Sequence, residues 1–92
     1  MTIYERQRII GLRLQRARQK ANLSLEQLAN KLDMQTKYKG DIEACVEFLQ
    51  LLEAGDIDIP LEIMAALHKE IGVTLRDLTA NLHAKELLEV GL

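Results

Sequence analysis

The stretch that decides the fold is LSLEQLANKL, at residues 23–32. Ser24 and Gln27 have the spacing of a capping box, in which two side chains satisfy backbone amides at the start of a helix. Three apolar positions then recur on one helical face, namely Leu28, Ala29 and Leu32. The stretch therefore predicts a short helix that begins at Ser24 and packs through this face.

Helical periodicity also dominates the rest of the chain, and no alternating strand pattern competes with it. Thr2 begins another capping box and predicts a helix that runs to about Lys20. Pro60 suits the first turn of a later helix, and Gly72 suits its end. A final helix, capped by Thr74, is expected at about 75–90. With one more helix between the second and the fourth, the fold is expected to be all-α with five helices.

That third helix has two possible starts. Apolar residues recur at three- and four-residue steps over 38–52, so a continuous helix over about 36–54 is possible. Gly40 inside such a helix costs about 1 kcal/mol relative to Ala. A start with Asp41 as the N-cap residue is equally consistent with the sequence. In both cases Gly55 ends the helix.

The charge of the chain is divided between its two halves, although the net charge is only −2. Residues 1–39 carry nine Lys/Arg and three Asp/Glu, whereas residues 40–92 carry three Lys/Arg and eleven Asp/Glu. A basic half can concentrate phosphate-binding potential. Alternatively, the two halves attract each other, within one monomer or between subunits. The sequence favours these two interpretations equally.

Composition excludes several classes of protein. Hydrophobic residues make up 48% of the chain but aromatic residues only 3%, which predicts an aliphatic core. No apolar run is long enough to span a bilayer, and the sequence shows no charged-then-apolar leader, so we expect a cytoplasmic protein. Cys45 is the only cysteine, which excludes an internal disulfide and agrees with a reducing compartment. His68 and His83 lack metal-ligand spacing. No catalytic arrangement is present, so neither a metal, a cofactor nor enzymatic activity is expected.

Two blocks of this sequence resemble the Cro/CI (XRE) family of helix-turn-helix regulators. Residues 23–32 resemble the first helix of the motif, and residues 52–78 resemble the downstream helices. The resemblance covers about residues 9–78. It implies a lambda-repressor-like single domain over residues 1–92, with a lengthened third helix. It also implies a homodimer on operator DNA, in which the second helix of the motif enters the major groove.

Some positions depart from the family pattern. Asp33 stands where the turn usually has Gly, and Met34 follows where the family prefers a small aliphatic residue. Leu25 stands where the family commonly has a Gln that contacts the DNA backbone. Between Met34 and the pair Leu52-Glu53 there are ten residues more than in the family.

The extra length allows two registers. In the first, residues 35–39 begin the DNA-reading helix, and Ile42-Glu43 matches the Ile-Glu pair that ends this helix in the family. In the second, Leu52-Glu53 matches that pair. The DNA-reading positions are then Val46, Glu47, Phe48, Gln50 and Leu51. Because only Gln50 could read a base there, the second register indicates a surface for protein–protein contact.

The lead prediction is a DNA-binding transcriptional regulator that acts as a homodimer. Its expected DNA contacts are Arg13, Arg16, Gln35, Thr36, Lys37, Tyr38 and Lys39. The alternative is a degenerate helix-turn-helix scaffold that binds a protein partner, such as a toxin, an activator or another regulator. The expected dimer or partner interface consists of Val46, Phe48, Leu49, Leu51 and Leu82.

Overall fold

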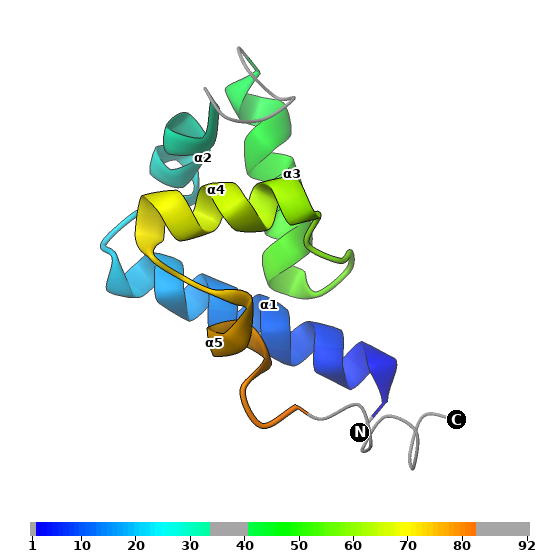
Figure 1. Cartoon of the computed structure of the whole chain (residues 1–92). Helices are drawn as coiled ribbons and strands as arrows, with labels where there is room; N and C mark the ends of the chain where they lie inside the picture. Colours follow the sequence, from blue (N-terminus) through cyan, green and yellow to red (C-terminus); the bar gives the residue numbers. More distant parts are fainter. Residues whose placement is uncertain (1, 34–40, 83–92) are drawn as a thin grey trace.

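The computed structural model describes residues 2–33 and 41–82, and in these ranges the chain is helical with no strand (Figure 1). The helices are α1 (Ile3–Lys20), α2 (Leu25–Asp33), α3 (Ile42–Ala54), α4 (Leu61–Ile71) and α5 (Leu75–Thr79). Helix α3 packs against both α1 and α2, while α4 packs on α2 and α5 packs on α1. The all-α, five-helix prediction is confirmed. None of the described helices is both long and apolar enough to cross a membrane.

Side-chain caps begin the helices where the sequence predicts them. Thr2 Oγ1 accepts a hydrogen bond from the Glu5 amide at 3.1 Å. Ser24 and Gln27 form the reciprocal box, with the Gln27 amide donating to Ser24 Oγ at 3.1 Å and the Ser24 amide donating to Gln27 Oε1 at 2.8 Å. These bonds satisfy amides that have no partner within the helix.

Of the two possible starts for the third helix, the structure has the later one. Asp41 is the N-cap residue, and its Oδ1 accepts from the Ala44 amide at 3.0 Å. The helix has 13 residues and ends at Gly55, which has a left-handed φ of 77°. This side-chain cap supplies a fixed beginning that a helix continuous through Gly40 would lack.

The last helix is shorter than predicted, because α5 ends at Thr79 and does not continue through Leu82. Arg13 of α1 donates through Nη1 to the carbonyl oxygens of Leu78 at 3.0 Å and Ala80 at 2.6 Å. Asn81 then takes a left-handed φ of 65°. The guanidinium group therefore satisfies carbonyl groups at the point where the helix ends. The remainder of the predicted helix lies outside the described residues.

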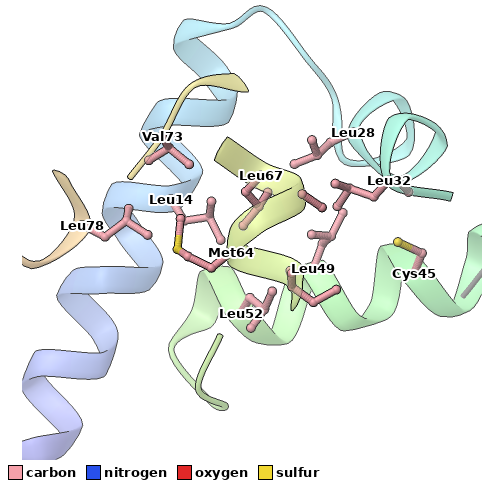
Figure 2. Packing of buried hydrophobic residues seen from close by; sticks show 13 residues of the cluster. Leu14, Leu28, Leu32, Cys45, Leu49, Leu52, Met64, Leu67, Val73 and Leu78 are labelled. Carbon is pink, nitrogen blue, oxygen red and sulfur yellow. The ribbon is translucent and has the colours of Figure 1, made fainter. Parts of the chain in front are cut away.

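Aliphatic side chains from α1 to α5 make a single core, as the composition predicts (Figure 2). The largest fully buried ones are Leu14, Leu28, Leu32, Leu49, Leu52, Ile63, Leu67 and Leu78. Gly11 allows α1 to approach the end of α3 closely. A Cβ atom at Gly11 would lie 2.5 Å from the carbonyl oxygen of Glu53 and 2.6 Å from that of Leu52. The crossing of these two helices therefore requires glycine.

Candidate functional site

An ion pair fixes the end of α3 against α1. Arg18 donates through Nε to Glu53 Oε2 at 2.7 Å and through Nη2 to Oε1 at 3.0 Å. Its remaining Nη1 donates to the carbonyl oxygen of Leu23 at 2.8 Å. The two side chains are only 10% and 6% exposed. The hydrogen bonds to Glu53 raise the pKa of Arg18, although burial alone would lower it. Arg18 therefore orients α3 and is not available to phosphate groups.

The predicted DNA contacts on α1 have different surroundings. Arg13 donates hydrogen bonds to the carbonyl oxygens of Leu78 and Ala80, and so joins α1 to the end of α5. Arg16 is exposed. The other predicted DNA contacts, at residues 35–39, lie outside the described residues.

A groove between α2 and α3 combines acidic and apolar side chains. Glu26 of α2 and Glu43, Glu47 and Gln50 of α3 are exposed along it. Ile42 and Val46 are half-buried at its base. Among the residues that the structure describes, no Lys or Arg lines this groove, which we call the acidic groove. Three carboxylates on one surface repel phosphate groups and attract cations.

The predicted interface residues are divided between the core and the surface. Leu49 is 0% exposed and lies in the core, so its assignment to an interface was wrong. Its face of α3 is turned inward because α1 and α2 both pack there (Figure 2). Val46 and Phe48 are half-buried, and Leu51 is 44% exposed. Leu82 follows α5 and is half-buried.

A second groove lies at the opposite end of α3, against α1. Arg8, Ile9 and Leu12 line it from α1, and Glu53 and Ala54 line it from α3. The exposed residues on this side of α1 follow four-residue steps and form a basic stripe: Arg8, Leu12, Arg16 and Lys20. Leu12, at 41% exposure, supplies an apolar contact between the cations.

Sequence reasoning did not single out Glu26 of the acidic groove, and of the basic stripe it named only Arg16. Glu26 joins the acidic groove only because α2 packs beside α3, a contact that no local pattern specifies. The four-residue spacing of the stripe was visible in the sequence. What the spacing could not show is which arginines remain exposed, since Arg13 and Arg18 are bound within the domain.

Neither family models, curated proteins nor solved structures contain a match to this chain. Within residues 2–33 and 41–82, no group of His, Cys, Asp and Glu side chains has an arrangement that could hold a metal ion. Cys45 is buried at 1% exposure.

Proposed function

We propose that this domain is a helix-turn-helix-type scaffold that binds a protein through the acidic groove and not DNA. The observation that carries the proposal is the composition of the exposed side of α3. Glu43 and Glu47 project there beside Glu26, and α3 has no basic residue. A duplex would bring phosphates against these carboxylates, whereas known DNA-reading surfaces supply cations to the backbone.

The position of the Leu52-Glu53 pair on α3 supports the second of the two registers. Leu52-Glu53 lies at the end of α3, where the family resemblance places its Ile-Glu pair. Ile42-Glu43 lies in the first turn instead. In this register the outward positions of α3 are Glu47, Gln50 and Leu51, which suit a polar rim around an apolar contact.

The groove calls for a partner segment with cations on either side of an apolar side chain. Half-buried Ile42 and Val46 can receive the apolar group, while the carboxylates pair with the cations. The basic stripe of a second copy has this composition, with Leu12 between Arg8 and Arg16. We therefore take the partner to be a second copy of the chain.

The two surfaces lie at opposite ends of α3, which favours a closed dimer. The acidic groove follows the first half of α3, and the groove beside Arg8 and Leu12 lies at its last turn. Two copies related by a two-fold axis near Leu51 would place each stripe against the partner's acidic groove. Such a contact is reciprocal and saturates at two chains. It agrees with the predicted homodimer and retains Leu51 as an interface residue.

Site-specific crosslinking in cells tests this proposal. A photo-crosslinking amino acid replaces Gln50 in the acidic groove or, as a control, exposed Lys69 on α4. We expect a dimer-sized product from position 50 alone, with the crosslink mapped to α1. A crosslink from position 50 to a different protein would show that this protein, and not a second copy of the chain, is the partner. A crosslink to nucleic acid would contradict the proposal.

DNA binding by a homodimer is the second candidate, because the stripe itself presents three exposed cations, Arg8, Arg16 and Lys20. Residues 35–39 would add Lys37 and Lys39. This candidate predicts binding to random duplex DNA that weakens steeply between about 50 and 200 mM salt. Replacing Lys37 and Lys39 by Ala should then reduce the salt slope by about 1 for each lost phosphate contact. Unchanged binding in the double variant would remove residues 35–39 from the DNA interface.

A further inference from the structure

A separate cavity lies between the start of α1, the loop that joins α3 to α4, and α5. Its volume is about 130 Å³. Its apolar wall includes Ile10 of α1, Leu52 of α3 and Ile57 of the loop. Arg6 of α1 is the cationic group on the wall. Among the described residues, none lines both this cavity and the acidic groove.

Arg6, which lines this cavity, has one unsatisfied hydrogen-bond donor. Its Nε atom is buried and has no hydrogen-bond partner among the described residues. Two polar neighbours are already engaged, since Gln7 Nε2 donates to Asp58 Oδ1 at 2.8 Å and Thr79 Oγ1 donates to the Leu75 carbonyl oxygen at 2.8 Å. Buried donors are nearly always paired in folded proteins, so an orphaned one beside a cavity indicates a missing acceptor.

We propose that this cavity binds a small monocarboxylate with an apolar body. The carboxylate would accept hydrogen bonds from Arg6, and the body would lie against Ile10, Leu52 and Ile57. The volume suits a ring or a short branched chain, since an apolar cavity of about 150 Å³ accommodates benzene. A guanidinium group is well matched to a carboxylate because it donates two parallel hydrogen bonds.

The same wall limits the charge of the ligand. Asp58 lines the cavity and carries a negative charge. A second anionic group on the ligand would approach this carboxylate and be repelled. Dicarboxylates and inorganic phosphate should therefore bind less well than a monocarboxylate of similar size.

Binding there would join three segments that are distant in sequence. Arg6 belongs to α1, Ile57 to the loop between α3 and α4, and Leu75 to α5. A ligand in contact with all three should strengthen the packing of α5 on α1. This inference does not depend on the partner of the acidic groove.

Titration of the ¹⁵N-labelled protein with benzoate tests the inference, with acetate and inorganic phosphate as comparison anions. Benzoate is expected to cause saturable shifts in the amide resonances of Arg6, Ile57 and Leu75. Acetate lacks the apolar body, and phosphate adds charge, so both should bind at least about tenfold more weakly. The absence of a saturable shift at millimolar benzoate, or equal responses to all three anions, would overturn the inference.

Arg6→Gln is compared with Lys69→Gln, a control variant at an exposed position of α4. Arg6→Gln should weaken benzoate binding by about tenfold or more, because a charge-assisted hydrogen bond is lost. Lys69 is exposed and does not line the cavity, so Lys69→Gln should leave benzoate binding unchanged. The unfolding midpoint of Arg6→Gln without benzoate should not fall, since an orphaned donor is removed. A lowered midpoint with unchanged benzoate affinity would assign Arg6 a structural role instead.

Discussion

Arg18 and Glu53 form a bidentate ion pair that joins α1 to the last turn of α3, with Nε 2.7 Å from Oε2 and Nη2 3.0 Å from Oε1. The third donor of the guanidinium group binds the Leu23 carbonyl oxygen just before α2. The Arg18 side chain therefore joins α1 to the end of α3 and to the residue that precedes α2. These bonds fix the position of α3 beside α2.

Removing one member of this pair should strongly destabilise the domain. Glu53→Ala leaves the Arg18 charge buried without its partner, and we expect the free energy of unfolding to fall by about 3 kcal/mol. Glu62→Ala, exposed on α4 and outside both grooves, should change it by no more than about 1 kcal/mol. Urea unfolding of both variants measures the difference. Equal effects would show that the ion pair does not stabilise the fold.

Gly11→Ala should destabilise the domain even though Ala is the better helix former. Helix propensity favours Ala by about 1 kcal/mol. The new Cβ would meet backbone carbonyl groups of Leu52 and Glu53, which cannot rotate away, so we expect a net loss of about 2 kcal/mol. A Cβ atom at Gly72 would meet no described atom within 4 Å beyond its chain neighbours, and Gly72→Ala should cost about 1 kcal/mol through its left-handed φ of 72°. A more stable Gly11→Ala protein would contradict this packing.

Arg13→Ala should loosen α5 from α1. Two hydrogen bonds to the Leu78 and Ala80 carbonyl oxygens are lost, at a cost of about 2 kcal/mol. Hydrogen exchange at the Leu78 amide should become faster, whereas the exposed control Gln19→Ala on α1 should leave it unchanged. If Arg13→Ala left exchange at the Leu78 amide unchanged but reduced the affinity for DNA, the result would support the phosphate-binding role predicted for Arg13.

The start of α5 should lose stability in acid. The hydrogen bond that the Thr74 amide donates to Asp77 Oδ2, together with the adjacent Thr74 side chain, lowers the pKa of Asp77 below its ordinary value. A carboxyl group with a lowered pKa in the folded state stabilises that state above its ordinary pKa, and the effect is lost as pH falls through the folded pKa. Asp77→Asn should therefore flatten the acid limb of the unfolding midpoint plotted against pH. Asp56→Asn, in the exposed loop after α3, is the control.

Local chemistry made much of the fold predictable. The caps at Thr2, Ser24 and Thr74 and the stop at Gly55 depend on residues within one turn, and each was found where the pattern predicts it. The start of α3 stayed open because the helical periodicity continues on both sides of Gly40. The choice then depends on the strength of the Asp41 cap.

Features that depend on distant residues could not be predicted. The end of α5 is set by Arg13, 65 residues before Leu78, so the apolar spacing alone extended that helix too far. Leu49 was assigned to an interface because α3 is apolar on several sides. Only the packing of α1 and α2 shows which of those sides is buried. The acidic groove likewise requires Glu26 and Glu47 to lie on neighbouring helices.

The contact between the acidic groove and the basic stripe is tested most directly by the mass in solution of two charge-reversed proteins. One carries Glu43→Lys and Glu47→Lys, and the other carries Arg8→Glu and Arg16→Glu. Each protein alone has like charges on both surfaces and should sediment as a monomer, whereas the wild-type protein should sediment as a dimer. An equimolar mixture should form heterodimers, because each groove then meets a stripe of opposite charge. Dimers of either variant alone, or a mixture that stays monomeric while the wild type dimerises, would contradict the account.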